Sequence, residues 1–409
     1  MGAPRATGEP GPRRGLAITL GVVLVLSLLL ILAIVGPAGF VVGIALALLP
    51  LPIYVLLALW IDRYEPEPRR LLAWAFIWGA GAATLIALIV NSVGIELVGA
   101  EFGSDVGEIY GGSVSAPVVE EGSKALALYG VYRWRRSELD GVLDGIVYAA
   151  MVGLGFATTE NVLYYGTEAI EHDVGVGTIF VMRGVASPFA HPIFTAMTGI
   201  GLALAATATK RSRRFWAPVL GLLGAMLLHS AWNTSSIDGG AFVLTFVFVM
   251  FPAFVALIVV ALVARRRDGR RVAAYLGPEV GRGLLSHEDV QALSTMSGRA
   301  RARRAARASG GKPAAKARGE LHRAATDLAF LRHRLALGRQ DPDAPAPAQQ
   351  EAEYVARIAQ LTGRLPAPPP QAAAPPPPPG PPPNWYPDPS GRFRLRYWDG
   401  YSWTGHTSA

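Results

Sequence analysis

The stretch VVEEGSKALALYGVY, residues 118–132, combines an apolar helical pattern with the charged side chains of Glu120, Glu121 and Lys124. A charge near the centre of a membrane helix costs roughly 2.5–3.5 kcal/mol. Apolar runs of about 20 residues, the length that spans a hydrocarbon core, recur on both sides of this stretch. The sequence therefore predicts an integral membrane protein whose charged side chains face one another or a wet cavity.

The composition supports this class. Of the 409 residues, 51% are hydrophobic and only 17% are charged, whereas about 25% charged residues are typical of soluble proteins. The chain has no cysteine, which excludes disulfides, thiolate metal sites and cysteine nucleophiles. The abundance of Ala, Arg, Pro and Gly suggests a bacterial genome of high GC content.

The apolar runs predict an all-α polytopic protein with about eight transmembrane helices. The first run is too long for a typical signal peptide and lacks an A-x-A site, so we expect it to be retained. The predicted spans are residues 15–35, 39–61, 70–92, 113–132, 142–165, 178–206, 215–236 and 240–264.

The charges between the spans predict the orientation. Arg and Lys occur in every second connection, as in KRSRR (210–214), whereas the connection at 94–112 carries four acids and no base. By the positive-inside rule, both termini are cytoplasmic. We therefore expect a multi-pass protein of the bacterial plasma membrane.

Several polar side chains fall at a similar depth within the predicted spans, at about 1.5 Å per residue. Lys124 lies three and four residues from the two glutamates, so it can pair with either one. One lysine cannot neutralise two carboxylates, so the second carboxylate requires a proton or another partner. The candidate site residues are Glu120, Glu121, Glu160, His191, His229 and Asn233, with Lys124 in a supporting role.

Three chemistries fit this set. Carboxylates near an imidazole can activate water for attack on an amide. Alternatively, His191, His229 and Glu160 can bind zinc, although the chain has no H-E-x-x-H motif. A transporter or sensor that binds protons or ions at the Glu/His cluster is the non-enzymatic alternative.

Four motifs resemble those of the PrsW-type intramembrane proteases, which are related to CAAX endopeptidases and bacteriocin-immunity proteins. EEGSK matches E-E-x-x-K, FATTE matches F-x-x-x-E, FAHPIF supplies a third position and HSAWN matches H-x-x-x-N. The resemblance covers roughly residues 40–265. It implies a glutamate-type endopeptidase that cleaves a membrane-anchored protein, such as an anti-sigma factor.

The resemblance also implies roles for individual residues. Glu120 is the expected general base, and Glu121 orients the site with Lys124. His229 and Asn233 are expected to stabilise the oxyanion, whereas the role of His191 is not separable from that of His229. Glu160 stands where CAAX-type relatives carry a histidine, which argues against CAAX cleavage. No cofactor is required in this scheme, and zinc is the alternative.

The predicted domains are a cytoplasmic segment at 1–14, the membrane protease domain at 15–264 and a basic cytoplasmic region at 265–364. A proline-rich linker follows at 365–383, and a small Trp-rich module occupies 384–409. The basic region is read as a positive-inside tail with no specific nucleic-acid partner.

Two amphipathic helices are predicted in the basic region. The proline-rich linker is expected to be an extended polyproline II arm. The final module resembles a short domain of unknown function found on bacterial membrane proteins. We expect a tiny Trp-pinned β-sheet that contacts a protein partner. The stripes of the two helices are Leu321, Ala325, Leu328, Leu331 and Leu335, then Val355, Ile358, Leu361 and Leu365.

Overall fold

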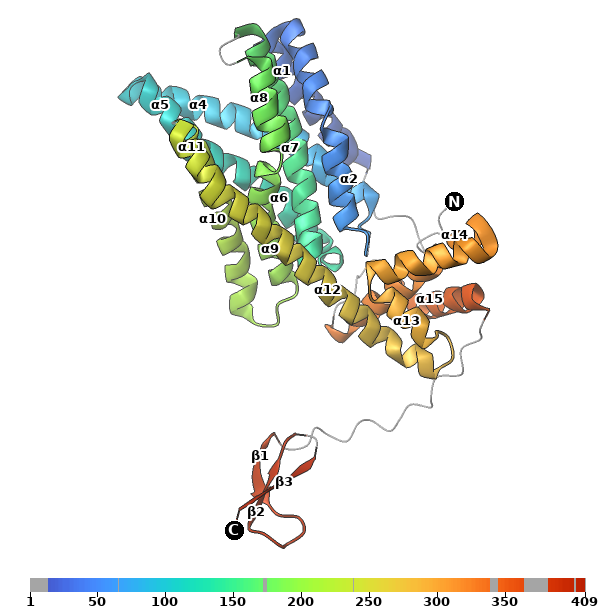
Figure 1. The fold of residues 1–409 in the computed structure, drawn as a ribbon. Coiled ribbons are helices and arrows are strands. Elements are labelled where there is room, and N and C mark those ends of the chain that lie inside the picture. The colour runs from blue at the N-terminus through green and yellow to red at the C-terminus, as the bar shows by residue number, and fades with distance from the viewer. Residues whose placement is uncertain are drawn as a thin grey trace.

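The structure is a computed structural model that describes residues 14–64, 66–171, 175–237, 239–338, 345–363, 382–400 and 402–408. Most of the predicted N-terminal segment and of the proline-rich linker, and Leu365, lie outside these residues. The chain is a multi-pass, all-α membrane protein with one small sheet at its C-terminal end (Figure 1).

The elements follow in chain order. The α-helices of the membrane part are α1 (Arg14–Leu48), α2 (Leu51–Ile61), α3 (Arg69–Ile77), α4 (Thr84–Phe102), α5 (Ser104–Tyr110), α6 (Ala116–Trp134), α7 (Val142–Glu171), α8 (Val176–Phe180), α9 (Ala190–Ala206), α10 (Arg211–Ser235), α11 (Gly239–Thr245) and α12 (Phe251–Gly281). Four π-helical turns and one 3₁₀ turn join them: η1 (Trp78–Ala83), η2 (Gly111–Ser115), η3 (Arg136–Glu138, 3₁₀), η4 (Val181–Ala186) and η5 (Phe246–Met250).

Among the described residues, six helical segments are long and apolar enough to cross a membrane, so the predicted count of eight is not confirmed. The first two predicted spans form one candidate, Gly15–Ile61, although α1 breaks at Gly36, which has φ 65° and precedes Pro37. Helix α6 is absent from the six because Glu120, Glu121 and Lys124 interrupt its apolar run.

Helix α7 is the central element of the bundle and packs against both α1 and α9. Glycines permit the close approach: a Cβ on Gly145 would lie 2.3 Å from the carbonyl oxygen of Gly199 on α9. On the same helix, a Cβ on Gly153 would lie 2.8 Å from the backbone nitrogen of Pro192. Small residues at such crossings are typical of membrane bundles, and here they bring the His191 segment against α7.

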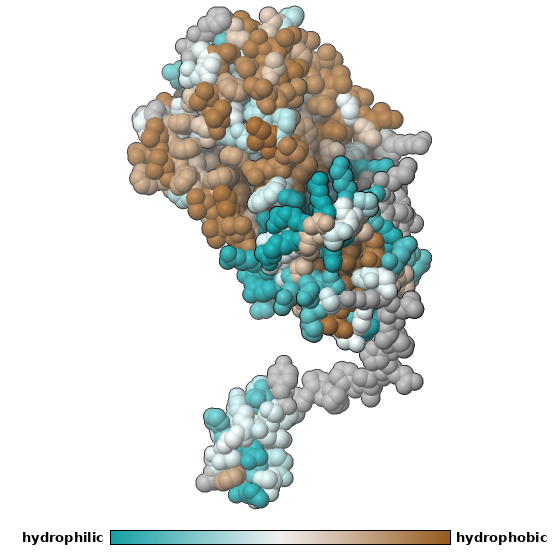
Figure 2. Space-filling view, turned by 45° about the vertical axis from the view of Figure 1, so that its right-hand side comes forward, coloured by the Kyte–Doolittle hydropathy of each residue, from teal (hydrophilic) through white to brown (hydrophobic). Residues whose placement is uncertain are grey.

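The outer surface of the bundle is strongly apolar. Large exposed side chains include Leu56, Leu97 and Phe248, at 64%, 67% and 71% exposure. Figure 2 shows this hydrophobic surface over the bundle and a hydrophilic surface below it, where the C-terminal helices begin. An apolar exterior of this extent is what a bilayer would cover.

The C-terminal helical unit consists of residues 268–338 and 345–363. It comprises the end of α12, α13 (His287–Leu293), α14 (Met296–Ala336) and α15 (Pro347–Thr362). Helix α12 continues past residue 264, the predicted end of its span, to Gly281 without a break. The predicted apolar stripes lie on α14 and α15, where Leu328 and Ile358 are fully buried in one core.

Two basic residues attach this unit to the membrane bundle. Arg299 donates to the carbonyl oxygen of Tyr64 at 3.0 Å and covers its ring at 3.9 Å. Arg334 pairs with Asp140 at 3.2 Å, just before α7. The unit therefore docks against the α2–α3 connection and the start of α7.

The C-terminal module is a three-stranded antiparallel sheet in the order β1-β2-β3. Its strands are β1 (Asn384–Pro387), β2 (Leu395–Trp398) and β3 (Trp403–Ser408). Asp388 fixes the first turn by accepting hydrogen bonds from the backbone of Arg392 and Phe393, at 3.1 and 3.0 Å.

Candidate active site

Helix α6 supplies the first three charged side chains of the site. Pro117 lies in its first turn, where a missing N–H is tolerated. Lys124 is completely buried and donates to Glu120 Oε2 at 3.3 Å and to Glu121 Oε1 at 2.9 Å. The i,i+3 and i,i+4 spacing thus produces the predicted pairing of one lysine with both carboxylates.

Glu121 has partners on two further helices. Its Oε1 also accepts from His229 Nδ1 on α10 at 3.2 Å. Its Oε2 accepts from Thr195 Oγ1 on α9 at 3.1 Å. Both oxygens are therefore engaged, and Glu121 holds α6, α9 and α10 together.

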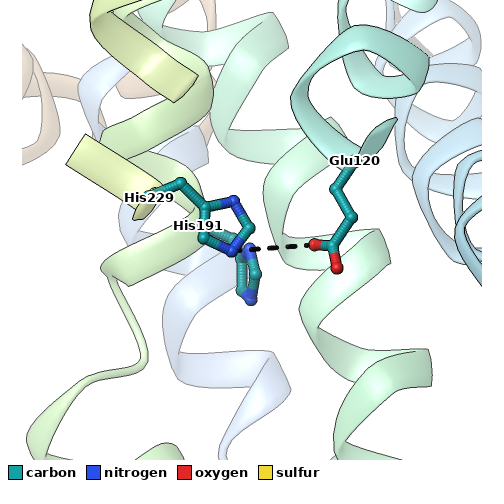
Figure 3. A group of neighbouring side chains, drawn as sticks. All are labelled: Glu120, His191 and His229. Atoms are coloured by element: carbon teal, nitrogen blue, oxygen red, sulfur yellow. Dashed lines mark ion pairs between the residues drawn. The ribbon is translucent and has the colours of Figure 1, made fainter. Parts of the chain in front are cut away.

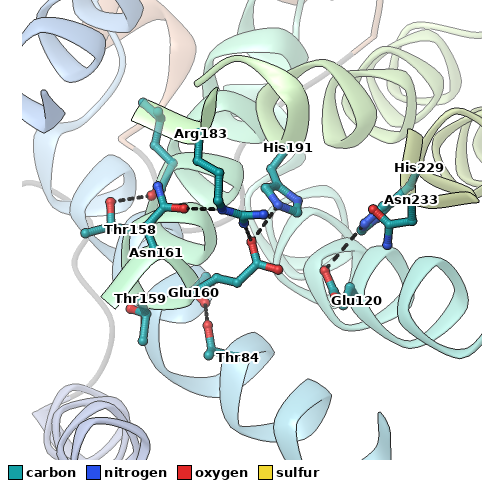
Figure 4. Close-up of polar contacts among 12 residues, drawn as sticks. Thr84, Glu120, Thr158, Thr159, Glu160, Asn161, Arg183, His191, His229 and Asn233 are labelled. Atoms are coloured by element: carbon teal, nitrogen blue, oxygen red, sulfur yellow. Dashed lines mark hydrogen bonds and ion pairs between the residues drawn. The ribbon is translucent and has the colours of Figure 1, made fainter. Parts of the chain in front are cut away.

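Glu160 on α7 forms a second carboxylate centre. Its Oε2 accepts from His191 Nε2 at 2.8 Å and from Arg183 Nη2. Arg183 also donates from Nε to Asn161 Oδ1 at 2.7 Å, and its guanidinium lies 3.8 Å from the Tyr164 ring centroid. Figure 4 shows Arg183 and His191 meeting at Glu160.

His191 joins the two carboxylate centres. Its Nδ1 accepts from Lys124 Nζ at 3.0 Å, while its Nε2–H points to Glu160. This pattern fixes one neutral tautomer, because the ammonium can only donate. The His191 and His229 rings are 5.2 Å apart and nearly perpendicular. The structure therefore brings Glu120, Glu121, Lys124, Glu160, His191 and His229 into one network.

Glu120 differs from the other two carboxylates in having fewer partners. Its Oε2 contacts Lys124 and lies 3.9 Å from His229 Nε2. That separation is too long for a direct hydrogen bond, and a single water can contact both atoms only by lying beside them, off the line that joins them. Figure 3 shows His229 and Glu120 facing each other across this separation, with His191 beside them.

Asn233 lies one turn beyond His229 on α10, as the H-x-x-x-N spacing requires. Its side-chain amide donates to the carbonyl oxygen of Gly112 in η2 at 3.0 Å. Asn233 therefore fixes the approach of η2 to α10, and one N–H of its amide group is not used by this bond.

The donor set resembles that of a metal site. Ligand atoms of Glu120, His191 and His229, all buried, lie within 4.8 Å of one another. A carboxylate with two imidazoles is a common set for catalytic zinc. The grouped carboxylate is Glu120 rather than the predicted Glu160, whose Oε2 is held by Arg183 and His191. Lys124 occupies the lone pair of His191 Nδ1, so metal binding there requires Lys124 to move.

A cavity of about 40 Å³ adjoins the network on the Arg183 side. This volume holds about three water-sized groups. The cavity lies between α2, α7, η4, α9 and α10, and the polar and aromatic residues on its wall are Tyr54, Thr158, Asn161, Arg183, Ser187, His191 and Trp232.

Three partners in the network were not predicted from the sequence: Arg183, Asn161 and Thr195. Arg183 interrupts the apolar span that begins at residue 178, and such a charge requires a buried partner. Its placement depends on η4, a π-helical turn, and π-helical turns occur frequently at functional sites. The charge could have been noticed in the sequence, but its pairing with Glu160 could not.

Comparison with known proteins gives two family matches, one for the membrane part and one for the C-terminal module. Residues 67–261 match the family described as "PrsW family intramembrane metalloprotease". Residues 383–409 match a family described as a protein of unknown function, DUF2510. No solved structure matches the chain.

Curated relatives named "Protease PrsW" agree with the first match. The protein of Clostridioides difficile (strain 630) is 31% identical over 172 residues, 42% of this chain and 69% of the relative. That of Bacillus subtilis (strain 168) is 29% identical over 172 residues, 42% of this chain and 72% of the relative. The protein of Geobacillus kaustophilus (strain HTA426) is 30% identical over 160 residues, 39% of this chain, and the match spans 65% of that relative.

Proposed function

Because this chain belongs to the PrsW family of intramembrane proteases, we propose that it hydrolyses a peptide bond of a membrane-anchored protein with water activated by Glu120. The observation that carries this proposal is the buried network of acids and imidazoles in which Glu120 Oε2 lies 3.9 Å from His229 Nε2, so that one water lying beside the two atoms can hydrogen-bond to both.

The proposed reaction begins with a water that contacts both Glu120 and His229. Glu120 removes a proton while the water oxygen attacks the carbonyl carbon of the substrate. The tetrahedral oxyanion accepts a hydrogen bond from the Nε2–H of His229, whose Nδ1 is held by Glu121. Glu120 then returns its proton to the leaving nitrogen as the C–N bond breaks, which yields a carboxylic acid and an amine.

The other members of the network position these groups. Lys124 restrains both glutamates of α6. Lys124 and Glu160 hold His191 in one tautomer, and Arg183 holds Glu160 in place. The free N–H of Asn233 is a further candidate donor to the oxyanion. The cavity beside His191 is where a substrate side chain could enter.

A metal-dependent form of the same hydrolysis is the second candidate, favoured by the proximity of Glu120, His191 and His229. In that form these three residues would hold zinc, which would supply a Lewis acid to polarise the carbonyl and to lower the pKa of a bound water. Lys124 must then release His191. Chelation followed by zinc addition, together with the metal content of the purified protein, distinguishes the two forms.

The proposed setting is a bacterial plasma membrane with both termini in the cytoplasm, as the positive charges on alternate connections favour. We propose an anti-sigma factor as the membrane-anchored substrate. Accessibility of single cysteines introduced near residues 8 and 405 to an impermeant reagent tests the orientation, since the chain has no other thiol.

The decisive experiment is cleavage in a reconstituted membrane. Comparison of membrane proteomes with and without the protein first identifies candidate substrates. Wild-type protein should cleave the candidate in liposomes, and Glu120→Gln should lower the rate by about 10²–10⁴-fold while the fold persists. Proton flux through liposomes without any cleaved protein would favour a transporter, and full activity of Glu120→Gln would refute the assigned base.

A further inference from the structure

The C-terminal module carries an aromatic face that the proposed hydrolysis does not use. Trp398 on β2 lies opposite Trp403 on β3, and their rings are 5.2 Å apart. Tyr386 on β1 meets Trp403 edge-on, with ring centroids 6.3 Å apart. Because side chains of a strand alternate between the two faces, these three aromatics share one face, which we call the Tyr386 face.

This face is only partly covered by the described residues of the chain. Trp403 is 37% exposed, and a three-stranded sheet of this size cannot enclose its aromatic rings. Trp385, 42% exposed, lies on the opposite face against Tyr397. Clustered exposed aromatics are typical of a surface that binds a partner.

The structure already shows prolines against this face. The Tyr386 hydroxyl donates to the carbonyl oxygen of Pro382 at 2.8 Å. A Cβ on Gly400 would lie 3.2 Å from Pro383 Cγ, so glycine leaves room for the proline ring. The contact combines an aromatic hydroxyl that bonds a proline carbonyl with a ring packed on the module.

We propose that the Tyr386 face binds a polyproline II segment, namely the proline-rich run 364–381 of a second copy of this chain. A polyproline II helix has no internal hydrogen bonds, so its carbonyls are free to accept, and it loses little entropy on binding. Aromatic grooves that recognise such helices use the same combination of ring stacking and hydrogen bonds. This inference goes beyond the proposed proteolysis and does not depend on it.

The length and stiffness of the run favour a second copy as the occupant. Its composition favours an extended arm, and 18 residues at roughly 3.1 Å each would reach about 56 Å. The run joins the module at Pro382, so a stiff run would have to reverse its direction to lie across the face beside its own attachment, whereas the run of a second copy need not. Copies held in one membrane are confined to a common plane, which favours contact between neighbours.

Binding of a labelled peptide tests the face. A fluorescent peptide of residues 364–383 is titrated into the full-length protein in nanodiscs and followed by anisotropy. We expect saturable binding that Trp403→Ala weakens about tenfold through loss of ring contact. Tyr386→Phe should weaken it about threefold, because the hydroxyl that bonds Pro382 is then no longer there for the incoming proline carbonyl to take over. Tyr386→Phe keeps the ring, so it tests the face even if Trp403→Ala unfolds the module.

The matched controls are Trp385→Ala on the opposite face and a peptide with alanine in place of each proline. Trp385→Ala should bind within about twofold of wild type, and the alanine peptide should not bind. Equal binding of the alanine peptide, or equal losses with Trp385→Ala and Trp403→Ala, would overturn the proposed face.

A complementation experiment tests the second copy. One variant lacks residues 366–381, and the other keeps them but carries Tyr386→Phe with Trp403→Ala. Neither should self-associate, whereas a mixture should, because one supplies the face and the other the run. Peptide binding without association in the mixture, or binding only to the variant that lacks its own run, would overturn the second copy as occupant.

Discussion

Two regions of this chain bury charged side chains, and they treat them differently. In the C-terminal helical unit, Arg299 donates to two backbone carbonyls and to Thr326 at 2.7–3.1 Å. Arg332 is likewise held by Glu279 and Glu351, both at 2.7 Å. These side chains have fixed partners around a leucine-rich core.

In the membrane bundle the acids share too few cations. Glu120, Glu121 and Glu160 face Lys124 and Arg183, and the two imidazoles complete the network. Glu121 is fully engaged, whereas Glu120 faces His229 across a gap. Buried charge alone therefore does not indicate a catalytic site. In the bundle, a carboxylate with few hydrogen-bond partners indicates one.

We expect the largest loss of stability from a substitution of Glu121, the carboxylate whose two oxygens are both hydrogen-bonded. Glu121→Gln removes the charge nearest Lys124, and breaking a buried pair costs about 3–5 kcal/mol. We expect this loss of unfolding free energy in SDS titrations in mixed micelles, together with loss of cleavage. Glu101→Gln, at an exposed position on α4, is the control. A Glu121→Gln variant as stable as wild type would contradict the structural role of Glu121.

Arg299→Met tests the corresponding position in the helical unit. It leaves the Tyr64 and Leu293 carbonyls without this donor, which should lower the unfolding free energy by about 3 kcal/mol. Cleavage under native conditions should change less than about threefold, since Arg299 does not contact the network. Arg304→Met, exposed on the same helix, should be neutral. A large loss of activity without loss of stability would contradict a purely structural role of Arg299.

The pH dependence of the helical unit follows from His322. Burial, and then the charges of Arg299, Arg318 and Arg303, lower its pKa to about 4. The unfolded state, with a pKa near 6.5, binds the proton first as pH falls. Stability is therefore complete above about pH 6.5 and is lost between there and pH 4.

At pH 5 this loss is about 2 kcal/mol, from 1.5 pKa units. His322→Gln should remove that part of the pH dependence in thermal or chemical unfolding. His287→Gln, at an exposed histidine, should keep it. Identical pH profiles of His322→Gln and wild type would show that His322 does not titrate as a buried group.

The smallest expected effect concerns Arg183 and tests whether this residue positions the network or binds the substrate. Lysine keeps the charge but cannot bond Glu160 and Asn161 together. Arg183→Lys should lower kcat about tenfold with KM nearly unchanged, if it positions His191 rather than binding substrate. Arg213→Lys, exposed on α10, is the control. A rise in KM at constant kcat would instead place Arg183 in substrate binding.

Much of this molecule could be predicted from short-range patterns. The spacing of Glu120, Glu121 and Lys124 fixes their pairing on one helix, because i,i+3 and i,i+4 neighbours share a face. The family motifs named every carboxylate and imidazole of the network. The apolar stripes likewise indicated that Leu328 and Ile358 would be buried.

The unpredicted part depends on contacts between distant segments. Nothing local to Arg183 shows that η4 will present it to Glu160 on α7. The number of spans was also not settled by hydropathy, because α6 carries its own charges and α1 with α2 forms one candidate. The extension of α12 to Gly281 could not be foreseen from the end of its apolar run at residue 264.

Helix α12 links the two compared regions as a single rod. Its 31 residues extend about 46 Å at 1.5 Å each, and the helix is unbroken between the bundle and the helical unit. One residue inserted near Arg267 would turn everything beyond it by about 100°. Arg299 and Arg334 would then swing away from Tyr64 and Asp140. The number of residues in α12 thus sets the rotation of the helical unit relative to the bundle.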